Sequence, residues 1–384
     1  MYQLDLASLS LEQFLAEYWQ KKPLLIKGGF QNFQDPLSAD ELAGLALDEQ
    51  VDARLIQRSE GSWQLDEGPF EHFEGYGEQD WTLLVQAVDH WHPAAATLLE
   101  PFRFIPNWRI DDLMVSFSAP GGGVGPHLDQ YDVFIIQGMG KRRWRVGMPD
   151  ASLEQFCPHP RLLQVSDFQA CIDAVMEPGD ILYIPPGCPH DGIALEPSLN
   201  YSVGFRAPAQ KDLFGGLADY LLDFQIDGER FSDPGRLASE SPGAIQGRDL
   251  AEIRQLMQAM LSDDDLISHW FGSYISQAKR ELDLQEPEPH YQAEEIAEYL
   301  EEGSVLGRLG GLRCCYQQLD ANADVQLFIN GDRFPLPATE LTTARLLTDQ
   351  PQLDEAACRH LVQTPERLGF ITQLINQGYW YFIE

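Results

Sequence analysis

Two short segments, at residues 126–129 and 189–190, constrain this chain more than any other feature. They supply two imidazoles, His127 and His190, and one carboxylate, Asp129. Three such ligands can hold one face of a six-coordinate ferrous ion and leave three adjacent positions open. Oxygen chemistry needs open positions, so the sequence predicts an iron-dependent oxygenase. In this interpretation the three side chains bind Fe(II) and form the catalytic centre.

The sequence around each ligand supports this interpretation. Asp129 follows His127 by two residues, and in a strand such residues project from the same face, so both could reach one ion. H-x-D alone arises by chance in many proteins. Residues 179–190, however, have the spacing G-x5-P-x-G-x2-H, which resembles the second motif of double-stranded β-helix, or cupin, barrels. Prolines in this segment fix φ and lower the entropy cost of holding His190 in place.

Between residues 100 and 206 the sequence predicts mainly strands. They are short, rich in Val, Ile, Phe and Tyr, and bounded by Gly and Pro, which is typical of a sandwich or barrel. The glycine-rich run 120–126 lacks the order of a phosphate-binding loop, so we expect a tight hairpin that delivers His127 to the barrel mouth. The predicted strands span 112–118, 131–137, 143–146, 181–184 and 199–205.

Helices are predicted on both sides of this region. Residues 10–20 space apolar side chains at helical intervals behind an N-cap serine, and a strand follows at 24–26. After Pro208 helical patterns dominate, apart from loop-like residues 226–248 and a linker at 285–289. The predicted helices span 211–225, 249–261, 264–282, 293–301, 338–347 and 365–376, with strands near 325–329 and 379–383.

Arg142 is the candidate anchor for a co-substrate. An iron that activates oxygen needs two further electrons, which 2-oxoglutarate commonly supplies while its keto acid end chelates the metal. Its distal carboxylate would then need a buried cation. Period-2 alternation puts Arg142 on the face of Trp144 and Val146, and a planar guanidinium suits a carboxylate if that face is the interior. The alternative is an exposed basic strand end.

Polar residues on two predicted strands suggest a ligand cavity in the barrel. Alternation puts Asn200 and Ser202 on one face, and Ser116 and Ser118 also share a face. We name Ser118 and Asn200 as candidates for supporting hydrogen bonds to the co-substrate. An ordinary strand serine or asparagine is the alternative for each.

The composition narrows the partners and the compartment. The 26 basic and 60 acidic side chains give a net charge of −34, divided equally between residues 1–207 and 208–384. This charge argues against nucleic acid and favours a basic partner, although solubility alone could explain it. No apolar run approaches the roughly 20 residues of a membrane span. The absence of a secretory signal and of C-x-x-C among six cysteines indicates a cytoplasmic protein with reduced thiols.

Several stretches resemble the bacterial ribosomal oxygenases. They are 126–134 (PHLDQYDVF), 142–144 (RRW), 179–187 (GDILYIPPG) and, similar too, 18–26 (YWQKKPLLI). Members of this family are JmjC-type, cupin-fold 2-oxoglutarate dioxygenases that hydroxylate an arginine at its β-carbon in a large-subunit ribosomal protein. By position, the resemblance implies His127, Asp129 and His190 as iron ligands and Arg142 as the 2-oxoglutarate anchor.

The resemblance also implies the organisation of the chain. We expect an α+β multidomain fold with a JmjC/cupin catalytic barrel at 1–207, a helical dimerisation domain at 208–285 and a winged-helix-like domain at 290–384. The helices predict a homodimer, and a basic ribosomal protein is the expected partner. The last segment carries 6 basic and 14 acidic groups, so a DNA-reading role is not expected.

Other functions stay open at this point. The same barrel could serve a JmjC-type N-methyl demethylase or a small-molecule hydroxylase. A non-catalytic dimeric binding protein with a vestigial pocket is a third reading, and the intact ligand positions argue against it. No motif identifies the residues that would grip the substrate arginine.

Overall fold

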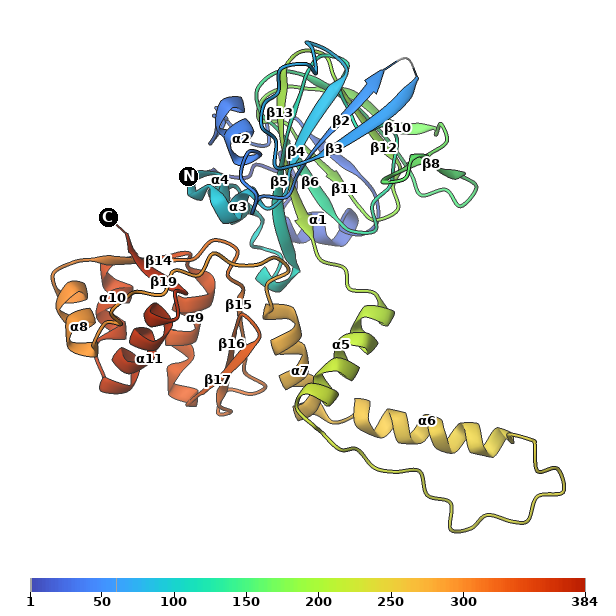
Figure 1. The fold of residues 1–384 in the computed structure, drawn as a ribbon, viewed down its shortest axis with the longest axis vertical. Helices are drawn as coiled ribbons and strands as arrows, with labels where there is room; N and C mark the ends of the chain where they lie inside the picture. Colours follow the sequence, from blue (N-terminus) through green and yellow to red (C-terminus); the bar gives the residue numbers. More distant parts are fainter. Residues whose placement is uncertain (1, 60, 384) are drawn as a thin grey trace. The chain divides into compact units, whose positions relative to one another are not determined.

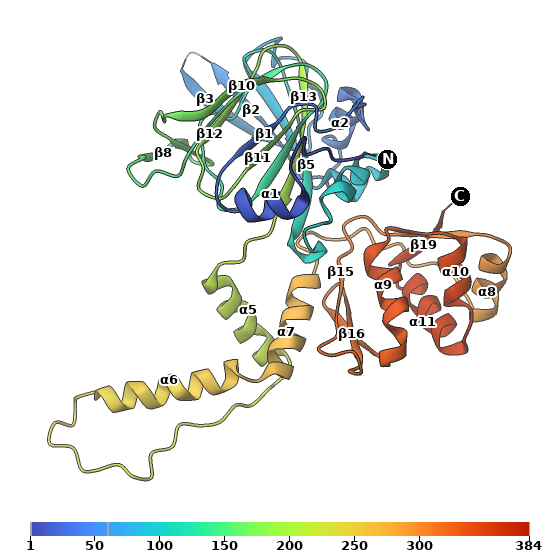
Figure 2. The same ribbon diagram turned by 180° about the vertical axis from the view of Figure 1, so that it is seen from behind.

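The computed structural model describes residues 2–59 and 61–383 of the chain. The chain divides into two compact units, Met1–Ala207 and Pro208–Glu384. Strands dominate the first unit, and most of the long helices belong to the second (Figures 1 and 2). Each unit has a hydrophobic core of its own.

An eight-stranded antiparallel sheet forms the frame of the first unit. Strands that are distant in sequence pair directly, so that the last strand of the unit lies between two earlier ones. In their order across the sheet, the strands are β1 (Leu24–Ile26), β11 (Ile181–Ile184), β6 (Val133–Gln137), β13 (Ser198–Phe205), β5 (Ile110–Ser118), β4 (Trp81–Val85), β2 (Ala53–Ser59) and β3 (Ser62–Glu67).

A smaller sheet completes a barrel. It contains β10 (Ala170–Met176), β7 (Arg142–Gly147) and β12 (His190–Ala194), and a hairpin of β8 (Gln155–His159) and β9 (Leu162–Val165) lies beside it in sequence. Both sheets contribute side chains to one buried cluster, so their inner faces lie against each other. This arrangement confirms the predicted barrel. The cluster contains Val133, Ile135, Leu182 and Ile184 from the larger sheet and Trp144, Val146 and Met176 from the smaller one.

The other face of the larger sheet carries the main core of the unit. Phe14 of helix α1 (Leu11–Glu17) is fully buried in it. Ser10 begins this helix, as predicted, because its Oγ accepts from Gln13 N while the Gln13 side chain accepts from Ser10 N. The other short helices are α2 (Ala39–Leu45), α3 (Val88–Trp91), α4 (Pro93–Ala96), η1 (Thr97–Phe102) and η2 (Asn107–Arg109). The buried side chains of β13 on this face are Leu199, Tyr201, Val203 and Phe205.

Every strand predicted between residues 100 and 206 is present, with bounds that differ by at most two residues. The sequence does not predict β2, β3, β4, β8, β9, β10 or β12. β12 explains why: it begins with His190, Asp191 and Gly192, and aspartate and glycine are rare in strands. It is a strand because β7 pairs with it along its whole length.

The second unit begins with three helices, α5 (Gln210–Asp223), α6 (Gly247–Leu261) and α7 (Asp264–Ser276). The prediction of a helix over 264–282 was wrong at its end. At Gln277 the backbone is extended, and the next amide, Ala278 N, donates to Asn330 Oδ1 at 3.3 Å. A tertiary hydrogen bond to a distant residue therefore competes with the last helical turn.

The remainder of the second unit mixes short helices with two three-stranded sheets, ordered β18-β14-β19 and β15-β16-β17. Helix α7 packs against β15, β16 and β17. In the described ranges of the chain, no helix has both the length and the apolarity of a membrane span. The elements are α8 (Ala293–Glu301), β14 (Val305–Arg308), β15 (Cys314–Gln317), β16 (Val325–Ile329), β17 (Asp332–Leu336), η3 (Ala338–Glu340), α9 (Leu341–Asp349), β18 (Gln352–Leu353), α10 (Glu355–Leu361), α11 (Pro365–Asn376) and β19 (Trp380–Ile383).

Candidate metal centre

His127, Asp129 and His190 converge at one end of the barrel interior. One ligand atom from each lies within 4.8 Å of the others. His190 Nε2 is 3.6 Å from Asp129 Oδ2, and the two imidazole centres are 4.2 Å apart. The structure therefore brings together the three residues that the sequence assigned to iron.

The backbone holds the two histidines together directly. His127 N donates to His190 O at 3.0 Å, and His190 N donates to His127 O at 2.8 Å. This pair is an isolated bridge, and His127 and Asp129 lie between the regular strands β5 and β6. Gly187 N donates to Asp129 O at 2.7 Å and ties the carboxylate segment to the proline-rich loop before His190.

The glycine-rich run delivers His127 to this bridge. Gly121 adopts φ +79°, a left-handed conformation that glycine reaches without steric cost. Gly121 N donates to Ala194 O at 2.8 Å, and Ala194 N donates to Gly122 O at 2.9 Å. From this turn the chain runs beside β12 as far as the His127–His190 pair. The glycine-rich run thus makes a tight turn and delivers His127, as the sequence predicts.

In both imidazoles the Nε2 lone pair is available to bind a metal ion. His127 Nδ1 lies 2.9 Å from Gly125 O, and His190 Nδ1 lies 3.0 Å from Cys188 O. Carbonyl oxygens only accept, so each Nδ1 carries the proton. Burial, and secondarily the nearby His127, lower the pKa of His190 to about 4, so its ring is neutral at pH 7. Two imidazole nitrogens and a carboxylate fit a divalent first-row ion in this position.

Arg142 lies in the barrel interior, as the alternation of β7 predicts. Its side chain is 4% exposed, whereas the neighbouring Arg143 is exposed. Its Nη2 donates to Ser118 Oγ at 2.5 Å and to Ser198 Oγ at 3.3 Å, and burial lowers its pKa to about 9. Within the described residues no carboxylate pairs with this guanidinium and its Nε has no hydrogen-bond partner. The site thus offers a buried cation to an anion.

Ser118 and Asn200 differ in their relation to Arg142. Ser118 Oγ contacts both Arg142 and Thr82 Oγ1, the latter at 2.8 Å. Asn200 lies one pair further along β13, where its Nδ2 donates to Gln137 Oε1 at 2.9 Å. Its Oδ1 is buried and has no partner in the described part of the chain.

The sequence did not predict two residues that lie in contact with Ser118 and Arg142. They are Thr82 and Ser198. Ser198 stands two residues before Asn200, so the alternation that selected Asn200 could also have selected it. Thr82 lies on β4, a strand that the sequence did not predict, and no local signal points to it.

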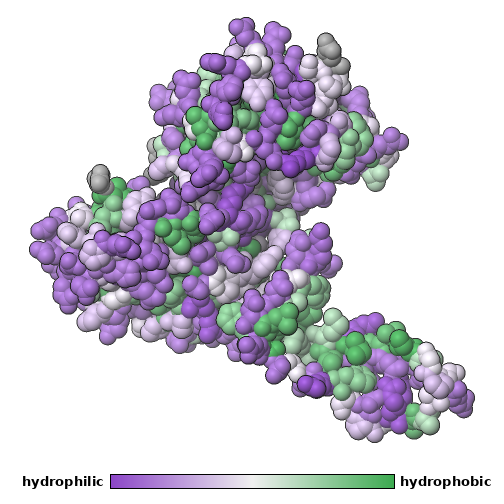
Figure 3. Space-filling view, viewed as in Figure 1, coloured by the Kyte–Doolittle hydropathy of each residue, from purple (hydrophilic) through white to green (hydrophobic). Residues whose placement is uncertain are grey.

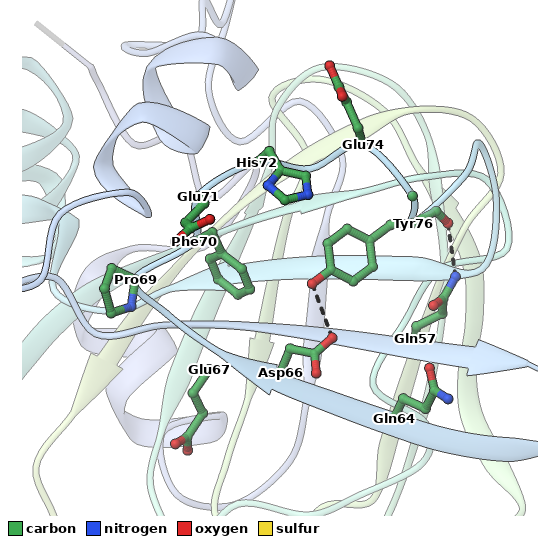
Figure 4. A pocket seen from close by; sticks show the side chains of 11 residues that line it. Gln57, Gln64, Asp66, Glu67, Pro69, Phe70, Glu71, His72, Glu74 and Tyr76 are labelled. Atoms are coloured by element: carbon green, nitrogen blue, oxygen red, sulfur yellow. Dashed lines mark hydrogen bonds between the residues drawn. The ribbon is translucent and has the colours of Figure 1, made fainter.

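A separate hollow of about 460 Å³ lies beside β2 and β3 (Figure 4). Tyr76 Oη donates to Asp66 Oδ2 at 3.1 Å across it, and Gln57 Nε2 donates to Tyr76 O at 2.9 Å. The described residues that line it include none of the predicted site residues. Its acidic side chains are Asp66, Glu67, Glu71 and Glu74.

Comparison with known proteins identifies the family. The model of the JmjC domain matches residues 97–213, and that of the ROXA-like winged helix matches residues 259–381. The chain is 49% identical over 381 residues to the ribosomal protein uL16 3-hydroxylase of Escherichia coli (strain K12), with 99% of both chains covered. It belongs to the ribosomal oxygenase family. The resemblance noted in the sequence is thus confirmed.

Other relatives agree with this membership. A probable ribosomal oxygenase of Haemophilus influenzae is 32% identical over 368 residues, with 92% of this chain and 90% of that protein covered. The structure of YcfD, a ribosomal oxygenase from Escherichia coli, in complex with cobalt and 2-oxoglutarate is 46% identical, has a TM-score of 0.89 and is matched over 100% of both chains. The family confirms the predicted fold class, a JmjC barrel followed by a winged-helix region.

Proposed function

We propose that this chain is an Fe(II)- and 2-oxoglutarate-dependent dioxygenase that hydroxylates the β-carbon of an arginine in the ribosomal protein uL16. The observation that carries the proposal is the convergence of His127, Asp129 and His190, with ligand atoms within 4.8 Å of one another, in a barrel that also buries Arg142. Full-length similarity to the Escherichia coli uL16 3-hydroxylase supports the same substrate.

The donor set supports a ferrous ion. Cobalt, which occupies the Escherichia coli structure, is a neighbouring first-row metal whose divalent ion accepts the same nitrogen and oxygen donors. When bound, the metal and 2-oxoglutarate supply oxygen activation and the electrons that hydroxylation needs. The chain itself orients both Nε2 atoms toward the metal position, because each Nδ1–H donates to a backbone carbonyl oxygen.

The co-substrate cluster supports 2-oxoglutarate. A distal carboxylate would neutralise Arg142, and Ser118 would hold the guanidinium in position. We keep Asn200 as a co-substrate contact because it pairs with Ser116 next to the Ser198–Ser118 pair on the inner face of the sheet.

Acidic and phenolic groups beside the metal ligands suit a guanidinium. Tyr131 is 43% exposed, but desolvation around its hydroxyl, followed by the charges of Asp129 and Asp112, raises the pKa of Tyr131 above its usual value. Tyr131 therefore stays protonated, and Asp112 is 9% exposed. We propose that the exposed Tyr131, two residues after the metal ligand Asp129, contacts the substrate arginine.

The test is direct hydroxylation of the ribosomal protein. The protein, Fe(II), 2-oxoglutarate and uL16 are incubated together, and the uL16 peptides are sequenced by mass spectrometry. We expect a gain of one oxygen at the β-carbon of one arginine, and none with His127→Ala. Equal spectra from the wild type and the variant would overturn the proposal.

Lysine demethylation is the second candidate. A relative named as a bifunctional lysine-specific demethylase and histidyl-hydroxylase from Drosophila persimilis is 25% identical over 244 residues, which covers 58% of this chain and 33% of that protein. Release of formaldehyde from a methylated lysine peptide, without a stable oxygen gain on uL16, would favour this activity over arginine hydroxylation.

We also propose a homodimer that forms through the helices of residues 208–285. None of the residues of α6 is buried within the described structure, although the helix is amphipathic. Hydrophobic side chains gather on the surface of this helical region in Figure 3. Light scattering should give twice the chain mass, and a protein ending near residue 206 should be monomeric. Exposed apolar residues of α6 are Leu250, Ile253, Met257 and Leu261.

The remaining organisation is proposed as follows. Residues 1–207 carry catalysis, 208–285 dimerisation, and 290–384 a winged-helix-like domain that does not bind nucleic acid, since acidic groups outnumber basic ones there. A ribosomal protein substrate supports action in the cytoplasm.

A further inference from the structure

Asp132 is a buried carboxylate at the end of the barrel from which both metal-binding segments leave. Its side chain is 0% exposed. It directly precedes β6, and the segment that carries Asp129 leads into it. The neighbouring strand β11 ends at the same place, where Ile184 pairs with Val133, and continues into the loop that carries His190. Asp132 therefore lies where the segments of both ligands meet the larger sheet.

Three donors from distant parts of the chain hold this carboxylate. Tyr183 Oη on β11 donates to Asp132 Oδ1 at 2.6 Å. Gln20 Nε2, shortly after helix α1, donates to Oδ2 at 2.9 Å, and Arg109 Nη2 donates to the same oxygen at 3.5 Å. Gln20 N also donates to Tyr183 Oη at 2.7 Å, so a ring of hydrogen bonds closes around the carboxylate. A carboxylate only accepts, and a buried one is unfavourable without its donors, so this network fixes its position.

The backbone around Asp132 is fixed as well. Asp132 O accepts from Phe205 N at 3.0 Å. Three residues earlier, Asp129 O accepts from Gly187 N at 2.7 Å. Between these two contacts lie Tyr131 and one neighbour, and both side chains are exposed. The direction in which Tyr131 points therefore depends on the two fixed ends of this short segment.

We propose that Asp132 is a positioning residue: it fixes the direction of Tyr131 and thereby the place where the substrate arginine binds beside the metal. The inference rests on the proposed function, in which Tyr131 contacts that arginine. The Asp129 end of the segment keeps its own backbone contact with Gly187. Loss of the network should therefore change the binding of the protein substrate and leave the metal ligands in place.

The competing explanation is that Asp132 only stabilises the barrel, and Asp180 provides the matched control. Asp180 is 3% exposed and directly precedes β11 at the opposite end of the same strand pair, where Gln137 N donates to Asp180 O at 2.9 Å. Its carboxylate is also held by distant and local donors, Gly28 N at 2.8 Å and Glu177 N at 2.7 Å. Asp180→Asn thus disturbs a comparable buried carboxylate at the end away from the metal ligands.

The test separates substrate recognition from folding and from metal binding. For each full-length variant, kcat/KM is measured with an arginine-containing fragment of uL16, the Kd values of Co(II) and 2-oxoglutarate by calorimetry, and Tm by thermal unfolding. We expect Asp132→Asn to lower kcat/KM on the order of 10-fold and to leave both Kd values unchanged. Asp180→Asn should lower Tm as Asp132→Asn does and keep the wild-type kcat/KM.

A double variant tests whether Asp132 acts through Tyr131. In the Tyr131→Ala protein, Asp132→Asn should cause no further loss of kcat/KM, because the side chain that it positions is already absent. Additive losses, an unchanged kcat/KM in Asp132→Asn, an equal loss in Asp180→Asn or weaker Co(II) binding would each overturn the inference. Wild-type protein that does not hydroxylate uL16 would instead overturn the proposed function, and the inference with it.

A milder variant serves if Asp132→Asn does not fold. Tyr183→Phe keeps the ring and removes one of the three donors. We expect a smaller loss of kcat/KM, which again disappears in the Tyr131→Ala protein. A Tyr183→Phe protein with the wild-type kcat/KM would refute the proposal.

Discussion

Replacing Arg142 by methionine should have two opposite effects. Methionine keeps most of the side-chain length but removes the charge. With the co-substrate present, the change breaks a buried ion pair, which costs about 3–5 kcal/mol. Since 1.4 kcal/mol is a factor of ten, Kd for 2-oxoglutarate should rise on the order of 100- to 4,000-fold.

Without co-substrate the same change should stabilise the protein. Arg142 is then a 4% exposed cation without a carboxylate partner among the described residues, and replacing buried charges by apolar groups gains about 1–4 kcal/mol. The variant loses the hydrogen bonds to Ser118 and Ser198, but Ser118 keeps Thr82. We therefore expect the lower end of that range and a Tm increase of about 2–4 °C.

The assay is thermal unfolding of the Co(II)-loaded protein, followed with and without saturating 2-oxoglutarate. The wild type should gain Tm from the ligand, and Arg142→Met should not. Arg143→Met is the control, because this neighbour on the same strand is exposed and pairs with Asp173. A variant that is less stable than the wild type without ligand, or that keeps its 2-oxoglutarate affinity, would refute the reasoning.

Three further predictions concern packing, metal and thiols. Gly192→Ala should lower the free energy of unfolding by about 1–3 kcal/mol, because the new Cβ would lie 2.7 Å from Trp144 Cη2. Gly215→Ala on α5 is the control: a Cβ there has nothing within 4 Å, so the change should raise the free energy of unfolding by up to about 1 kcal/mol. Chemical denaturation measures both. Co(II) at about 100 times its Kd should stabilise the wild type by about 2.7 kcal/mol, and a chelator should reverse the gain. Burial raises the pKa of the Cys188 thiol to about 12. Iodoacetamide at pH 8 should therefore leave Cys188 unmodified in the native protein while the exposed Cys157 reacts, and peptide mapping would show both. Rapid alkylation of Cys188 would contradict its burial.

The inner and outer faces of the barrel strands follow from alternation alone. β7 and β13 each contain residues that the two-residue period assigns to opposite faces, and Arg142 and Tyr201 are found on the sides expected. A strand with one face against a core has little freedom to shift its register, because a shift by one residue would expose every buried side chain.

The strands that escaped prediction depend on their partners. β12 has an aspartate and a glycine near its start, and β4 supplies Thr82 to a cluster whose other members lie far along the chain. Local propensity carries little information for such segments, since their backbone hydrogen bonds are made with strands distant in sequence.

The amino-acid sequence by itself determined the chemistry of this protein: the ligand types at His127, Asp129 and His190, the inward face of Arg142, and the acidic surface. Spacing and side-chain chemistry are properties of a chain segment, so they can be read without a fold. Only the tertiary structure decided which backbone pair joins the two histidines, that Arg142 finds serines but no carboxylate among the described residues, and that Tyr183 of β11 donates to Asp132. These features arise from pairing between distant strands, and no local pattern encodes such a pairing.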